Sequence, residues 1–132
     1  MKTFASVLAG AALLLSGATA ASAETVAEKG EAELARLLDG RTAGEPVSCI
    51  TAHNSNRLRV IEHVGVVYDA GKTIYVSRAT DPKSLGPWDV PVIERFGSQL
   101  CKTDVVRTVD RSGGFLSGVV FLNDFVPYTK AG

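Results

Sequence analysis

Two cysteines and two histidines are the residues of this 132-residue chain whose side chains could do covalent or metal chemistry. They are Cys49, His53, His63 and Cys101. Together they would supply two thiolates and two imidazoles, which is a donor set found in zinc sites. A thiolate beside a histidine could instead act as a nucleophile. The third use of the two cysteines is a structural disulfide.

The sequence favours the disulfide. An even number of cysteines in an exported protein, which folds in an oxidising compartment, is typical of a disulfide. A bridge between Cys49 and Cys101 closes a loop of about 50 residues, which the chain-entropy model values at roughly 4 kcal/mol. No third residue is identifiable that would orient a histidine beside a thiolate. The spacing of the four residues matches no compact zinc signature. We therefore predict no catalytic residue, no metal ligand and no cofactor.

The expectation of export comes from residues 1–23. Lys2 supplies a positive start, an apolar run covers residues 4–15, and the small residues 21–23 follow. This is the layout of a secretory signal peptide, and its apolar run is too short to span a bilayer. We expect cleavage after Ala23, with cleavage after Ala20 as the weaker alternative. The mature chain would then be periplasmic or secreted.

Composition narrows the class of the remaining chain, residues 24–132, which suits a single domain. Without Lys2 it has 13 basic residues (14 − 1) against 14 acidic ones, a net charge of −1. Nucleic-acid binding needs a strong basic excess, which neither half of this segment has. No later stretch is apolar for the roughly 18 residues that a membrane-spanning helix needs. We expect neither a nucleic-acid partner nor an integral membrane protein.

Residues 24–40 predict a short amphipathic helix. Thr25 followed by Glu28 fits a capping box, and Gly40 stands where a left-handed C-terminal cap belongs. Gly30 should weaken the middle of the helix by about 1 kcal/mol relative to alanine. The apolar stripe is more typical of docking onto the protein's own sheet than onto a partner. It consists of Ala27, Leu34, Leu37 and Leu38.

Residues 41–132 predict one disulfide-linked antiparallel β domain. The hairpin at residues 69–72 is the clearest local signal, because Gly71 can take the positive φ that such a turn needs. Residues 79–91 hold three prolines and are expected to form a long loop. The fold class is mainly β: a small antiparallel sheet, sandwich or partly closed barrel with one short N-terminal helix. Strands are expected at residues 47–51, 57–62, 64–69, 73–78, 92–95, 102–110 and 117–124.

Trp88, Arg57 and Arg59 are the candidate partner contacts. Trp88 is the only tryptophan and lies between two prolines, which would hold the backbone extended and offer the indole as an anchor. Arg57 and Arg59 share one face of a predicted strand, where they could meet an anionic partner such as lipid headgroups or cell-wall polymers. The alternatives are an indole that covers the end of the sheet and arginines that form cross-strand ion pairs.

Four segments of the chain look familiar when taken together: GRTAGEPVSCI (40–50), VVYDAGKTIYVSR (66–78), FGSQLCKTDVV (96–106) and NDFVPYT (123–129). They resemble a group of small exported proteobacterial proteins known as a domain of unknown function. The resemblance covers nearly all of residues 24–132, although no single motif is diagnostic, and Cys49 and Cys101 match two cysteines that recur in that group. It implies export and a β-rich domain, and it implies no activity.

The leading hypothesis is a non-catalytic periplasmic or secreted protein that binds a cell-envelope component. One alternative is a small hydrolase or metal-dependent enzyme that uses His53 and His63. Another is a secreted protease or lysozyme inhibitor that displays loop 79–91. The chain contains no glycine-rich phosphate loop, HExxH, GxSxG or paired CxxC motif, so the best-marked enzyme classes are not indicated. The sequence by itself specifies neither the ligand nor the oligomeric state.

Overall fold

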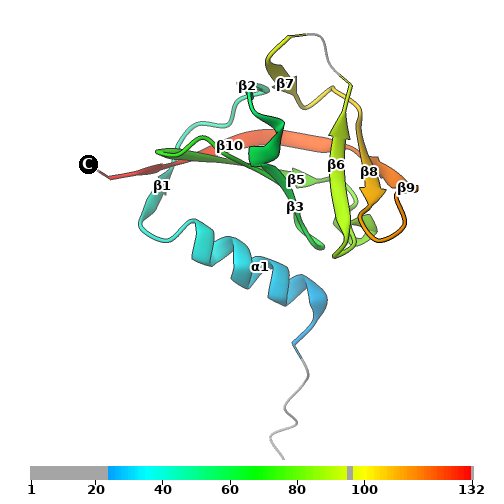
Figure 1. Ribbon diagram of the computed structural model, residues 1–132. Helices are drawn as coiled ribbons and strands as arrows, with labels where there is room; N and C mark the ends of the chain where they lie inside the picture. The colour runs from blue at the N-terminus through cyan, green and yellow to red at the C-terminus, as the bar shows by residue number, and fades with distance from the viewer. Residues whose placement is uncertain (1–23, 95–96, 132) are drawn as a thin grey trace, which may run out of the picture.

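A computed structural model describes residues 24–94 and 97–131, so the expected signal peptide at residues 1–23 lies outside the described residues (Figure 1). The described helices are α1 (Val26–Leu37) and two short 3-10 helices, η1 (Ser55–Arg57) and η2 (Pro82–Ser84). The described strands are β1 (Arg41–Ala43), β2 (Cys49–Thr51), β3 (Leu58–Ile61), β4 (Gly65–Asp69), β5 (Thr73–Ala79), β6 (Asp89–Ile93), β7 (Gln99–Cys101), β8 (Val106–Asp110), β9 (Leu116–Val120) and β10 (Leu122–Lys130).

The strands of the described ranges form three antiparallel sheets, and none of these closes into a barrel. The central sheet has the order β1-β10-β5-β4-β3, a three-stranded side sheet has the order β6-β8-β9, and β2 pairs with β7. Helix α1 lies below the central sheet in Figure 1, and the two smaller sheets lie on its other side. The prediction of a mainly β protein with one N-terminal helix is confirmed.

Helix α1 is capped as its sequence predicts. The N–H of Glu28 donates to the hydroxyl of Thr25 at 3.1 Å, which satisfies one of the free donors of the first turn. Gly40 has φ of +73° just beyond the helix, the left-handed conformation that glycine adopts without strain.

Gly30 allows the helix to approach the sheet closely. It is buried, and a Cβ atom at this position would overlap the carbonyl oxygen of Glu62 and lie 2.8 Å from a methyl group of Val64. The glycine that we expected only to weaken the helix is therefore the residue through which the helix contacts the turn after β3.

The central sheet is buried on both faces because its strands carry apolar residues at successive positions. On β4, Val67 packs toward the helix, whereas Val66 and Tyr68 pack toward the smaller sheets. The core on the helix side contains Leu34, Ile61, Val64, Val67, Ile74 and Val76. The larger core on the other side contains Ile50, Ala52, Leu58, Val66, Tyr68, Ala79, Leu85, Leu100, Val106, Val120, Leu122 and Phe125.

The predicted hairpin between β4 and β5 is confirmed. Gly71 has φ of +91°, and the N–H of Ala70 donates to the carbonyl of Thr73 at 2.9 Å. Arg41 stabilises the same turn from β1, because its guanidinium donates to the carbonyl oxygens of Gly71 and Lys72 at 3.1 and 2.8 Å.

The prediction of one strand at residues 117–124 is wrong. β9 ends at Val120 and β10 begins at Leu122, and the two strands belong to different sheets. β10 then continues to Lys130, between β1 and β5. Pro127 fits inside this strand because it lies beyond the last residue pair of β1 and β10. Its carbonyl accepts a hydrogen bond from the N–H of Gly44, and its missing N–H would point to the same side of the strand.

The boundaries of the predicted loop at residues 79–91 also need correction. Ala79 belongs to β5 and residues 89–91 belong to β6, where Pro91 is tolerated because β6 is an edge strand. Between them Leu85 is fully buried. The loop is therefore anchored at its middle and does not project freely.

The predicted strand at residues 102–110 begins later than expected. β8 starts at Val106, because Asp104 accepts a hydrogen bond from the N–H of Cys101 at 2.7 Å and turns the chain there. The short strands β1 and β7 were not predicted at all.

Candidate binding surface

Cys49 and Cys101 form a disulfide, as predicted, with an S–S distance of 2.02 Å. The two residues lie opposite each other in the β2–β7 pair, 52 residues apart in sequence. Their neighbours Ile50 and Leu100 are buried in the larger core, so the bridge holds the two-stranded sheet against that core. Because both sulfurs are bonded, neither is a thiolate that could attack a substrate or bind a metal.

The two histidines belong to different segments. His53 is exposed in the loop after β2, whereas His63 is half-buried in the turn between β3 and β4, with φ of +56°. Nowhere in residues 24–94 and 97–131 do three or more His, Cys, Asp or Glu side chains gather closely enough to hold a metal ion. The enzyme alternative therefore gains no ligand cluster and stays an untested prediction.

A hollow of about 200 Å³ lies where β3 and Glu33 of α1 meet β6, and we call it the β6 hollow. Its apolar lining comes from two strands and two prolines, and its charged lining comes from two arginines and two acidic residues. The lining residues are Glu33, Leu58, Arg59, Val60, Pro87, Asp89, Val90, Pro91 and Arg111.

The structure brings only one of the two predicted arginines to this hollow. Arg59 is half-exposed and forms an ion pair with Glu33 of α1, with 3.4 Å between Nη2 and Oε1. Arg57 ends η1 instead of sharing the strand, and its guanidinium donates to the carbonyl of Asp69 at 3.4 Å. Arg57 lines a separate hollow of about 420 Å³, which Arg59 also borders.

Arg111 is the functional candidate that sequence reasoning missed. It follows β8 directly, and its N–H donates to the carbonyl of Trp88 at 2.8 Å. No ion pair found in the described part of the chain includes Arg111. The pairing of Asp89 with Asp110 brings Arg111 to Trp88, and this register is not apparent from the sequence.

The carboxylate of Asp110, the residue before Arg111, is hydrogen-bonded within the turn between β8 and β9. The hydroxyl and the N–H of Ser112 donate to Asp110, and these hydrogen bonds hold the pKa of its carboxyl below the ordinary value of 3.8. Asp110 is therefore ionised at neutral pH and hydrogen-bonded within the β8–β9 turn.

Trp88 stands at the rim of the β6 hollow. It lies between Pro87 and Asp89, which both line the hollow, and 56% of the residue is exposed. This exposure fits an anchor for a partner better than a cover over the sheet.

A buried carboxylate fixes the turn that carries the indole. Asp89 accepts hydrogen bonds from the N–H of Gly86 and the hydroxyl of Ser117, each at 2.7 Å. The hydroxyl of Ser117 is also 2.9 Å from that of Thr108, which is buried on β8. These bonds join β6, β8 and β9 from the inside and hold the backbone on both sides of Trp88.

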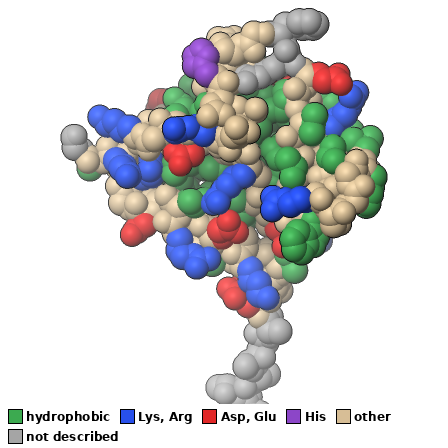
Figure 2. Space-filling model, in the orientation of Figure 1, with side chains coloured by type: hydrophobic (Ala, Val, Ile, Leu, Met, Phe, Trp, Pro, Cys, Tyr) green, Lys and Arg blue, Asp and Glu red, His purple; other side chains and the backbone are tan. Residues whose placement is uncertain are grey.

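The outer face of the side sheet is apolar around one ion pair. Hydrophobic side chains gather over β6, β8 and β9 on the right of Figure 2. Val92, Arg107 and Val119 lie in one row across the three strands. In the next row, Val90 and Leu116 flank Val109.

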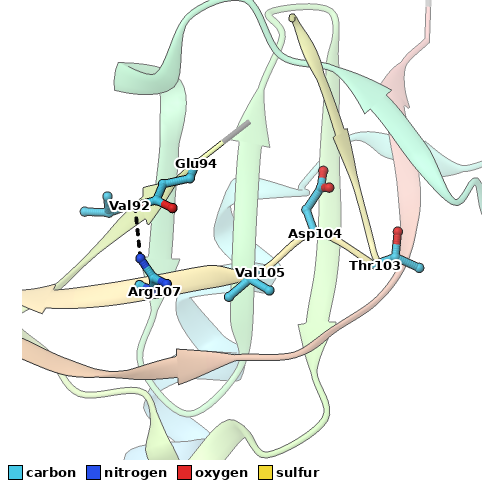
Figure 3. A pocket seen from close by; sticks show the side chains of 6 residues that line it. All are labelled: Val92, Glu94, Thr103, Asp104, Val105 and Arg107. Atoms are coloured by element: carbon cyan, nitrogen blue, oxygen red, sulfur yellow. Dashed lines mark hydrogen bonds and ion pairs between the residues drawn. The ribbon is translucent and has the colours of Figure 1, made fainter. Parts of the chain in front are cut away.

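A third hollow, of about 320 Å³, lies at the other end of this face (Figure 3). Arg107 and Glu94 point toward each other there, with 3.0 Å between Nη1 and Oε1. The guanidinium of Arg107 is the single positive group in the lining of this hollow, and it is already paired with Glu94. Because Asp104 also lines the hollow, negative charge is in excess there. This hollow does not suit an anionic ligand.

Comparison of the chain with protein-family models, with curated proteins and with solved structures found no match. The resemblance noted in the sequence therefore stays a prediction. Within the described residues, no helix is long and apolar enough to cross a membrane.

Proposed function

We propose that this chain is a non-catalytic exported protein that binds an anionic component of the cell envelope at the β6 hollow. The observation that carries the proposal is the guanidinium of Arg111, which has no ion-pair partner among the described residues and lines the same hollow as Arg59. Guanidinium groups bind phosphates and carboxylates through two parallel hydrogen bonds. Such a group is a ready site for an anion.

The lining of the hollow favours an anionic amphiphile. Its volume of about 200 Å³ is below the roughly 300–1,000 Å³ of pockets that enclose whole small molecules, so it suits a headgroup and not a complete ligand. Val90 and Val92 continue from the hollow as exposed apolar surface, and Trp88 adds an amphipathic ring of the kind found at membrane interfaces. An anionic phospholipid supplies both kinds of contact.

The disulfide supports the exported location in this proposal. Bridges of this kind form and persist in oxidising compartments such as the periplasm and the extracellular space. The signal-peptide pattern of residues 1–23 points to the same compartments.

Vesicle sedimentation tests the proposal. The protein should bind vesicles of phosphatidylcholine with phosphatidylglycerol, and salt should weaken the binding because the attraction is electrostatic. Replacing Arg111→Gln should lower the affinity about fivefold, since a basic residue near an anionic surface contributes about 1 kcal/mol. Arg57→Gln is the matched control, because Arg57 does not line the β6 hollow.

Two outcomes would count against the proposal, and a third would change the ligand. Equal binding to pure phosphatidylcholine vesicles would show that the anionic group is not recognised. An equal loss in the Arg57→Gln control would show a general charge effect. Binding to dextran sulfate but not to vesicles would replace the lipid by an anionic polymer.

A further inference from the structure

The free edge of β9 differs from the other free edges of the two larger sheets. Edge strands present unpaired N–H and C=O groups, and proteins commonly block them with charged residues or proline. β1, β3 and β6 carry Arg41, Arg59 and Pro91, respectively. Residues 115–122, with the sequence FLSGVVFL, contain no charged residue and no proline.

The same segment exposes large apolar side chains. Ten large hydrophobic residues are exposed among those described, and four of them fall within residues 115–121. We call these four the β9 patch: Phe115, Leu116, Val119 and Phe121, which are 58%, 60%, 41% and 63% exposed. With roughly 150–250 Å² for each aromatic side chain, the patch exposes on the order of 400 Å² of apolar surface.

We infer that the β9 patch is an interface with a second copy of this chain, which pairs through the same edge about a two-fold axis. A standard interface buries about 800 Å² on each partner, of which about 56–65% is apolar. The patch therefore exposes nearly as much apolar surface as a stable dimer needs. Two copies of an uncharged segment bring no like charges together, whereas an anionic or a cationic partner would gain no ion pair there.

The pattern of edges in the two larger sheets favours a dimer over longer assemblies. A two-fold contact uses the β9 edge of both copies, and the other edges of the larger sheets carry residues that oppose strand addition. A bulge shifts the register between β8 and β9 at Thr108 and Val109. Phe115, Leu116 and Phe121 supply the side-chain burial of the contact.

The dimer does not depend on the function proposed above. β6 and β9 are opposite edges of the side sheet, so the β6 hollow and the edge that pairs in the dimer belong to different strands. Two hollows on one dimer would strengthen attachment to a surface that displays many anionic groups.

Sedimentation velocity of the protein recovered from an exporting host tests the dimer. Between about 10 µM and 1 mM, the range that reveals a weak dimer, the sedimenting mass should double. Replacing Val119→Lys should weaken the dimer at least tenfold, because each copy would bring a positive charge into the apolar contact. Val26→Lys is the matched control, since Val26 begins α1 and is 40% exposed against 41% for Val119.

The readout separates this dimer from other outcomes. A thermal melt should show that Val119→Lys still folds, and Phe121→Ser serves as a second variant if it does not. A monomer throughout the range would overturn the inference. Larger polymers would also overturn it, as would a dimer that neither Val119→Lys nor Phe121→Ser weakens. A monomer that attaches to neutral vesicles through Phe115 and Phe121 would do the same.

Discussion

The two edges of the side sheet differ in chemistry although both strands pair with β8. The β6 edge has Pro91, which lacks an N–H, and it borders a hollow that carries two guanidinium groups. The β9 edge has neither charge nor proline and exposes two phenylalanines. Two edges of one sheet can therefore have separate roles: β6 for an anionic ligand and β9 for a second copy.

The hydrogen bonds of Asp89 connect the two edges inside the sheet. Asp89 begins β6, and its carboxylate accepts a hydrogen bond from Ser117 of β9. Variants that disturb one edge, both edges or neither should therefore give distinct results.

Removing the disulfide should have the largest effect on stability and no specific effect on either edge. The double variant Cys49→Ala with Cys101→Ala should lower the free energy of unfolding by about 4 kcal/mol, because the bridge closes a long loop. Urea denaturation measures the loss. A folded variant that no longer binds vesicles or dimerises would contradict the independence of both edges from the β2–β7 pair.

Replacing Asp89→Ala should disturb both edges together. The change leaves the N–H of Gly86 and the hydroxyl of Ser117 without their acceptor, at a cost of about 2–3 kcal/mol in unfolding free energy. Vesicle affinity and dimer affinity should both fall. Asp81→Ala is the control, because Asp81 is exposed and its side chain makes no capping hydrogen bond. Loss of only one of the two affinities would show that the edges are not coupled through Asp89.

A pair of aromatic variants should separate the two edges. Trp88→Ala should lower vesicle affinity by roughly 5- to 30-fold, since a central aromatic anchor contributes about 1–2 kcal/mol, and should leave the dimer unchanged. Phe121→Ala should do the opposite. Vesicle sedimentation and sedimentation velocity on both variants measure the two effects. Two variants with the same profile would mean that the edges form one surface.

The smallest effect is expected away from both edges, at the ion pair between Glu31 of α1 and Arg78 of β5. Hydrogen bonding from Arg78 holds the pKa of Glu31 below its ordinary value of 4.5. A carboxylate with a lowered pKa stabilises the fold above its unfolded pKa, and the stabilisation disappears as pH falls through the lower folded pKa. Because both side chains are half-exposed, Glu31→Gln should cost no more than about 0.5 kcal/mol at neutral pH.

Urea midpoints measured at about pH 7 and about pH 3 check this sign. The difference between the wild type and Glu31→Gln should be present at the higher pH and smaller at the lower one. A difference that grows as the pH falls would contradict it.

Local chemistry made several elements predictable. The helix follows from Thr25 and Gly40, the hairpin from Gly71, and the disulfide from the cysteine count in a chain that starts like an exported one. The helix and the hairpin depend on residues close in sequence, and the disulfide depends on the oxidising environment expected for an exported protein.

The features that the sequence did not reveal depend on contacts between segments far apart in the chain. Proline is rare in a central strand, and Pro127 is tolerated in β10 because it faces Gly44, beyond the last pair of β10 with β1. Arg111 reaches Trp88 because Asp89 pairs with Asp110, a match that no local pattern encodes. Gly30 looked unfavourable until the helix was placed against the sheet.

The fluorescence of Trp88 is the most direct test of the central claim, because this residue is the only tryptophan and stands at the rim of the β6 hollow. Vesicles that contain phosphatidylglycerol should shift its emission to shorter wavelength and protect it from acrylamide, and Arg111→Gln should reduce both changes. Binding of the vesicles with an unchanged emission and unchanged quenching would contradict the account.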